Sequence, residues 1–246
     1  MKLPSLSPKI FFFTILFGTL VFNTQANPLK NNNIILGDSL FKKKDYQASL
    51  RLYKIAFDED HAFSQQMLAR MAMIEETADH YVMTLFYLNT MYSYYPDSRV
   101  MQKMEDMGNQ YRLMGYNYTD LEYAITVYKE YYYYIIFSLS ALGFPFIIYL
   151  YLRKRKKKRL GIRPLIFLCI LGAAYYLNNY DITPAMGIIH YDCTAMEGPS
   201  PGSSTLEQIE AGHRVRVIRN EGIWYEIVWK TKHVFIRDVY LLPIGN

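Results

Sequence analysis

The sequence predicts a multidomain α + β membrane protein with α-helical repeats, two transmembrane helices and a small C-terminal β-barrel. Three observations predict this fold class. Apolar residues recur at helical spacing in the first half, two uncharged stretches flank a basic segment, and short alternating runs separated by Gly, Pro and Ser fill the C-terminal part. The folded parts are therefore expected at residues 27–129, 131–152, 162–180 and 187–246.

Residues 1–26 have the pattern of a secretory signal peptide. A basic start is followed by the apolar run Ile10–Phe22, and Thr24 and Ala26 are small residues placed for cleavage after Ala26. We therefore expect export of the chain. An uncleaved anchor is the alternative, although this run is short for a membrane span.

The net charge of +5 comes from one segment. Eight of the 27 basic residues lie between Arg153 and Arg163, which leaves 19 basic against 22 acidic residues elsewhere. A basic run beside an apolar stretch is typical of a cytoplasmic loop in a membrane protein. We therefore expect no nucleic-acid partner, and a cytoplasmic loop at residues 153–161.

Two uncharged stretches predict transmembrane helices on either side of this loop. Residues 131–152 carry no charge over a length sufficient to cross the hydrocarbon core, and residues 162–180 form a shorter apolar stretch. Tyrosines at 131–134 and at 175, 176 and 180 match the interfacial preference of this side chain. This topology predicts an inner-membrane protein whose N- and C-terminal modules are periplasmic. A buried core helix is the alternative for the first stretch.

The segment Leu36–Phe57 contains two short apolar-periodic runs on either side of a Lys-rich turn, which predicts an antiparallel helix pair. The pair resembles a tetratricopeptide repeat (TPR). The residues that carry the resemblance are Leu36, Gly37, Asp45, Tyr46, Leu52, Tyr53 and Ala56. Asn33, Ser49 and His61 depart from the family pattern.

Degenerate copies of this pattern follow at a period of about 34 residues. Helix pairs are expected at 67–95 and 97–129. The resemblance implies a concave face that holds a partner protein, for which Lys42, Lys54 and Arg70 are the candidate residues. A plain helical bundle with a Met and Tyr core is the alternative.

Residues 187–246 predict short strands. His213–Ile218 alternates strictly, with Val215 and Val217 on one face and the arginines on the other, and Trp224–Val228 follows a Glu-Gly turn. The order of residues resembles a bacterial Src-homology-3-like (SH3-like) domain. The matching residues are Ala195 to Ser200, Leu206, Ile209, Ala211, Gly212, Val215, Val217, Trp224 and Tyr225.

The resemblance weakens at the last strand, where Val234-Phe235-Ile236 replaces Gly-Trp-Val and Thr231-Lys232-His233 replaces a Gly-containing turn. Trp224 and Tyr225 are candidate partner-binding residues, and the alternative is that Trp224 fills the core. Such domains bind wall peptides or proteins in bacteria, so the resemblance implies peptidoglycan as a possible ligand.

The sequence offers no catalytic constellation. The histidines lack metal-ligand spacing, and the two cysteines, Cys169 and Cys193, form no C-x-x-C pair. No Cys-His or Ser-His-Asp set can be assembled. We therefore predict a protein that is not an enzyme and that has no catalytic residues, metal site or cofactor. The five histidines are His61, His80, His190, His213 and His233.

The domain order resembles that of the BatE-like proteins of the Bacteroides aerotolerance operon, which combine TPR and SH3 modules. The resemblance implies an envelope scaffold for protein–protein interaction in an aerotolerance or stress-related complex. It also implies von Willebrand A-domain membrane proteins of the same operon as partners. A peptidoglycan-binding tether between membrane and cell wall is the alternative function.

Overall fold

The structure is a computed structural model that describes residues 31–155 and 185–244, and between them residues 162, 166, 169, 170, 172, 173 and 176. The predicted signal peptide at 1–26, positions 156–161 of the predicted basic loop, and most of the stretch 162–180 lie outside the described residues. The chain divides into two compact units, residues 1–67 and 68–246. Each unit is described by itself below.

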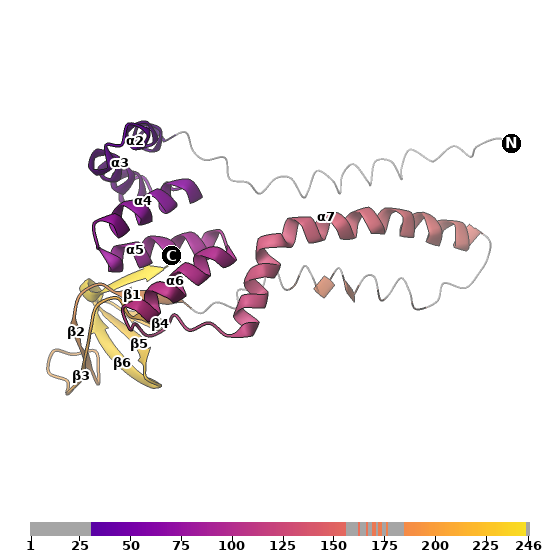
Figure 1. Cartoon of the computed structure of the whole chain (residues 1–246). Helices are drawn as coiled ribbons and strands as arrows, with labels where there is room; N and C mark the ends of the chain where they lie inside the picture. The colour runs from indigo at the N-terminus through magenta and orange to yellow at the C-terminus, as the bar shows by residue number, and fades with distance from the viewer. Residues whose placement is uncertain are drawn as a thin grey trace. The chain divides into compact units, whose positions relative to one another are not determined.

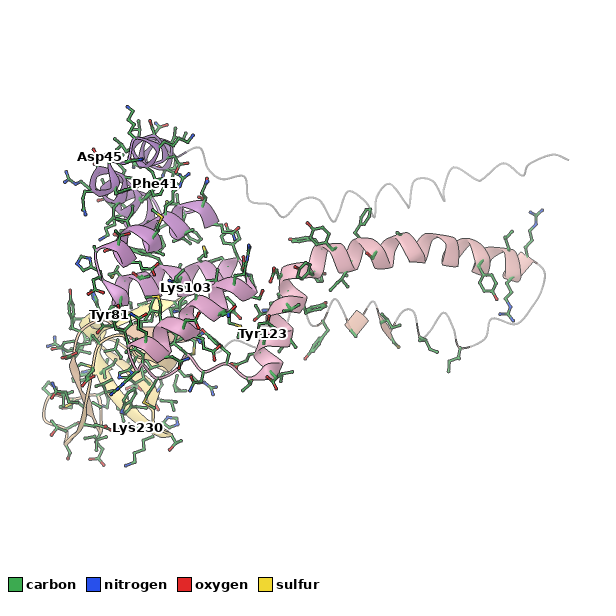
Figure 2. The ribbon with its side chains drawn as sticks, viewed as in Figure 1. Phe41, Asp45, Tyr81, Lys103, Tyr123 and Lys230 are labelled. Atoms are coloured by element: carbon green, nitrogen blue, oxygen red, sulfur yellow. The ribbon has the colours of Figure 1, made fainter. Side chains whose placement is uncertain are left out.

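The first unit contains the helix pair α2 (Asn32–Lys42) and α3 (Tyr46–Asp58) (Figures 1 and 2). Asn31 caps α2 by accepting from the backbone N–H groups of Asn33 and Ile34, and Asp45 caps α3 through the N–H of Ala48. Gly37 packs against the ring of Tyr53, which is fully buried. The helix pair expected between Leu36 and Phe57 is therefore present.

Helices α4 (Gln65–Thr77), α5 (Tyr81–Tyr94) and α6 (Ser98–Gln110) follow the first pair, and α7 (Asp120–Arg155) is the longest helix in the described part of the chain. Asp97 begins α6 by accepting from the N–H of Arg99. Methionines fill much of the buried face, including Met101 and Met104. The helices expected at 67–95 and 97–129 are present, with the second helix of the last pair continuing as α7.

The transmembrane helix expected at 131–152 is a wrong prediction, and the one expected at 162–180 lies mostly outside the described residues. Among the described residues, no helix is long and apolar enough to cross a membrane. The uncharged stretch 131–152 lies within α7, but its first turn consists of tyrosines, whose hydroxyl groups make a helix less apolar than the absence of charge suggested. The assignment to the inner membrane, with periplasmic N- and C-terminal modules, rested on these helices and is corrected with them.

The C-terminal part of the second unit is an antiparallel sheet of seven strands in the order β3-β2-β6-β5-β4-β1-β7. Six sets of strand pairings connect them, and a 3-10 helix, η1 (Asp238–Tyr240), precedes the last strand. The strands are β1 (Met186–Ile189), β2 (Cys193–Met196), β3 (Thr205–Ile209), β4 (Arg214–Glu221), β5 (Trp224–Trp229), β6 (Lys232–Arg237) and β7 (Leu241–Ile244).

The sheet is open, so the predicted small β-barrel is also wrong. Strands β3 and β7 lie at opposite ends of the strand order and do not pair with each other. The β2–β6 pairing is limited to Met196 opposite Phe235, and the register shifts between Ala195 and Met196. Alternation of side chains predicted the strands, but closure depends on long-range pairing that alternation does not specify.

One face of this sheet carries its core. Because opposite residues in an antiparallel pair point to the same side, the register places Val215, Ile227, Trp229, Val234 and Ile236 on one face. These side chains pack with those of the neighbouring strands and exclude water. The full core cluster is Ile189, Cys193, Ala195, Ile209, Val215, Ile227, Trp229, Val234, Ile236 and Leu241.

Candidate functional site

The candidate site lies on the other face of strands β4, β5 and β6, and we call it the arginine face. The strand register arranges it in three cross-strand rows. Its positions alternate with those of the core cluster, so the fold itself presents them on the opposite side of the sheet. The rows are Arg216–Val228–His233, Arg219–Glu226–Phe235 and Glu221–Trp224–Arg237.

A charged network occupies the middle of the arginine face. Glu226 accepts hydrogen bonds from Arg219 Nε and, at 2.6 Å, from His233 Nδ1. Arg219 Nη1 also lies 2.8 Å from a carboxylate oxygen of Glu221. The hydrogen bond from His233, followed by that from Arg219, lowers the pKa of Glu226. Glu226 is therefore ionised at neutral pH although its residue is 7% exposed.

Two further arginines frame this network. Arg216 and Arg237 are exposed, and within the described part of the chain neither has an ion pair with a carboxylate. Arg219, by contrast, already contacts two carboxylates, those of Glu221 and Glu226. The face thus presents two guanidinium groups that are available for an external anion.

Two aromatic side chains share the cross-strand rows with these charged residues. Trp224 is 7% exposed and Phe235 is 9% exposed, although both point away from the core cluster. Trp224 and Phe235 are therefore the aromatic residues of the arginine face, and both are buried.

A segment between α6 and α7 fixes the sheet to the helices of the second unit. The backbone N–H of Met114 donates to His213 Nδ1 at 2.8 Å, and the N–H of Arg214 donates to the Met114 carbonyl at 3.0 Å. The buried hydroxyl of Tyr116 donates to the Gly212 carbonyl at 3.0 Å. We call this contact between residues 113–118 and 212–214 the joint.

The joint is tightly packed. The ring of Tyr81 in α5 (Figure 2) stacks on Tyr111 at 4.4 Å and borders Gly212, where an added Cβ would lie 2.8 Å from Tyr81. The Arg214 guanidinium lies 5.5 Å from the centroid of the Tyr118 ring. Burial raises the pKa of Tyr118 to about 12, so its hydroxyl stays protonated at neutral pH.

The structure separates the two candidate residues of the sheet. Trp224 lies on the arginine face and is buried, whereas Tyr225 points to the core cluster and is half-buried against it. Adjacent residues of a strand point to opposite faces, so the two side chains cannot form one platform. The tryptophan of the core cluster is Trp229, whose Nε1 donates to Glu207 at 3.1 Å.

The three candidate partner-binding residues on the helices do not all belong to one unit. Lys42, exposed at the end of α2, and Lys54, half-buried on α3, belong to the first unit, whereas Arg70 on α4 belongs to the second. Lys54 lies near Asp58, where burial raises the pKa of the carboxyl group and Lys54 opposes the increase.

Sequence reasoning missed most of the arginine face. Arg216, Arg219, His233 and Arg237 were not among the candidates, although the alternation of residues 213–218 already placed the arginines of that run away from the valines. The same alternation in Lys232–Arg237 places His233 and Arg237 on one side. To group these residues into one site, one must know which residues of neighbouring strands lie opposite each other. The alternation within a single strand does not give this register.

The described residues form no group of three or more His, Cys, Asp and Glu side chains that could hold a metal ion. Burial raises the pKa of the Cys193 thiol to about 11, so this core cysteine is protonated at neutral pH and is a poor nucleophile. The arrangement of the arginine face suits recognition of an anion by charge-assisted hydrogen bonds.

Comparison with known proteins finds no matching family model, no matching curated protein and no matching solved structure. The resemblances to TPR, SH3-like and BatE-like proteins therefore remain predictions from the sequence.

Proposed function

We propose that this chain is a non-catalytic interaction protein that binds a protein partner on its arginine face. The observation that carries the proposal is the pair of exposed arginines, Arg216 and Arg237, in the rows on either side of the Arg219–Glu226 ion pair. Arginine is enriched where proteins recognise one another, because its planar guanidinium forms several directed hydrogen bonds.

The joint supports this proposal. Backbone and side-chain hydrogen bonds at Met114, Tyr116 and Arg214 hold the sheet on the helices of the second unit. A recognition surface that is held rigid loses less conformational entropy when a partner binds. In this proposal the helices are a scaffold that presents the sheet, and von Willebrand A-domain proteins are the first partners to test.

Photo-crosslinking tests the proposal in cells that make the protein natively. A photoreactive amino acid replaces Ile223, which is 53% exposed in the turn between Glu221 and Trp224. The matched control replaces Leu206, which is similarly exposed on the edge strand β3. We expect a discrete protein adduct from position 223 that is absent at position 206.

Two results would contradict the proposal. The absence of any protein adduct at position 223 would remove the arginine face as a protein-binding surface. Adducts that contain peptidoglycan fragments in place of protein would favour the wall-binding function that the SH3-like resemblance implies.

A further inference from the structure

We infer that the arginine face binds an extended acidic segment of its partner, and that Arg216 and Arg237 each take one carboxylate of that segment. This inference rests on the proposed function and specifies the chemistry of the partner. It follows from how charge is distributed over the three cross-strand rows.

The charge balance of the arginine face favours an anion at its two ends. Arg219 and Glu226 of the middle row form an ion pair with each other, Arg219 also contacts Glu221 of the third row, and His233 of the first row donates to Glu226. Arg216 belongs to the first row and Arg237 to the third, and both are exposed. A ligand therefore gains most by placing negative charge at the two ends and neutral groups over the middle.

The register gives the spacing of those two charges. Arg216 and Arg237 lie on strands separated by β5, and their rows are separated by the four-residue step from Val228 to Trp224. With strands about 4.8 Å apart and a rise of about 3.3 Å per residue, their Cα atoms lie roughly 16 Å apart. A peptide in extended conformation covers this distance in about five residues.

The carboxylates of the arginine face also define which ligands are disfavoured. A uniform polyanion such as a nucleic acid would bring phosphates close to Glu226, which lies between the two exposed arginines, and to Glu221, which shares a row with Arg237. Like charges at such distances repel. An extended peptide avoids this repulsion when its acidic residues are separated by neutral ones. The charges of the arginine face therefore favour a peptide over a nucleic acid, and they favour acidic residues that are spaced apart.

The test uses the full chain and a fluorescently labelled Gly/Ser peptide that carries two glutamates about five residues apart. Binding is measured by fluorescence anisotropy at low and at physiological ionic strength. We expect saturable binding that weakens as salt is added, because the contacts are exposed ion pairs. The same peptide with glutamines, and one with adjacent glutamates, should bind several times more weakly.

Charge-removing variants assign the contacts. Arg216→Gln and Arg237→Gln should each weaken binding by about fivefold, which is typical of an exposed ion pair, and the double variant should weaken it further. Arg51→Gln is the matched control, since Arg51 is exposed on α3 and its loss changes the net charge equally. Thermal unfolding of each variant should match that of the unchanged chain, because both arginines lie in water.

Equal binding of the glutamine peptide, or unchanged binding by the double variant, would overturn the inference. Tighter binding of a single-stranded oligonucleotide than of the acidic peptide would overturn it too. If these tests fail while position 223 still crosslinks to a protein, the proposed function stands and the partner is recognised by other chemistry. If position 223 gives no protein adduct, the function itself is wrong.

Discussion

The Nδ1 atom of His213 accepts a 2.8 Å hydrogen bond from the backbone N–H of Met114. An amide N–H can only donate, so the imidazole must be neutral, with its proton on Nε2. The ring is also 5.0 Å from the Trp229 ring, in an edge-to-face arrangement. The His213 side chain therefore links the segment after α6 to the core cluster of the sheet. This link requires the neutral imidazole, so protonation of the ring in acid removes it.

The first prediction concerns acid sensitivity of the joint. Burial lowers the pKa of His213 and nearby Lys230 lowers it further, whereas Glu210 opposes them. The unfolded chain therefore takes up this proton at a higher pH than the folded chain does. The contribution of neutral His213 to the free energy of unfolding is complete above about pH 6.5. It is lost as the pH falls from there through the lowered pKa of the folded chain. Urea unfolding followed by tryptophan fluorescence should show this decrease.

Two variants isolate the His213 effect from that of the other histidines. His213→Asn keeps an oxygen acceptor near the position of Nδ1 but does not titrate, so it should flatten the pH dependence in this window. His61→Asn is the control, because His61 is exposed and has a φ of 49°, which Asn tolerates. An unchanged pH profile in His213→Asn would show that His213 has the same pKa in the folded and the unfolded chain, and would contradict the prediction.

The second prediction concerns close approach of the backbone at the joint. Gly115 has a φ of +91°, and an added Cβ would lie 2.1 Å from the carbonyl oxygen of Arg214. Gly222 has a φ of +69° with no heavy atom within 4 Å of such a Cβ. Gly222→Ala should therefore lower the free energy of unfolding by about 1 kcal/mol, because only the backbone conformation is strained. Gly115→Ala should lower it by about 3 kcal/mol, because the added Cβ also clashes with the Arg214 carbonyl. Equal changes in the free energy of unfolding would contradict the packing at the joint.

Local periodicity predicted most of the elements. The spacing of Leu36, Tyr53 and Ala56 predicted the first helix pair, and the alternation around Val215 predicted β4, because both patterns reflect burial of one face of one element. The joint could not be predicted in this way. It depends on contacts between residues about a hundred positions apart, such as Met114 and His213.

The two wrong predictions have related causes. The absence of charge in residues 131–152 predicts a membrane helix, but tyrosine is uncharged without being fully apolar. The closed barrel was inferred from the order of residues such as Ala195 and Trp224, whereas closure depends on which edge strands meet. The sequence leaves open whether Trp224 is exposed or fills the core, and only the register between strands places it on the arginine face.

The third prediction concerns the carboxylate at the centre of the arginine face. Glu226 accepts from both His233 and Arg219, whereas Glu221 contacts Arg219 and is more exposed. Glu226→Gln should therefore lower the free energy of unfolding more than Glu221→Gln does. Since the folded pKa of Glu226 is lowered, its stabilising effect is complete above its unfolded pKa and is lost as the pH falls through the folded value. Urea unfolding of both variants at neutral and acidic pH measures this, and an equal effect at neutral pH would contradict it.

The last prediction concerns the helix pair of the first unit. An added Cβ at Gly37 would lie 2.6 Å from Tyr53 Cε1, and this ring is fully buried with its hydroxyl donating to Asp38 at 2.7 Å. The ring cannot retreat without losing that hydrogen bond, so Gly37→Ala should destabilise the pair by about 2 kcal/mol. In a Tyr53→Leu background the space beside position 37 is larger, and the same substitution should cost less than 1 kcal/mol. Hydrogen exchange of the α2 and α3 amides, measured by mass spectrometry in the full chain, gives all four free energies of the cycle. Additive effects of the two substitutions would show that α2 and α3 do not meet at Gly37 and Tyr53.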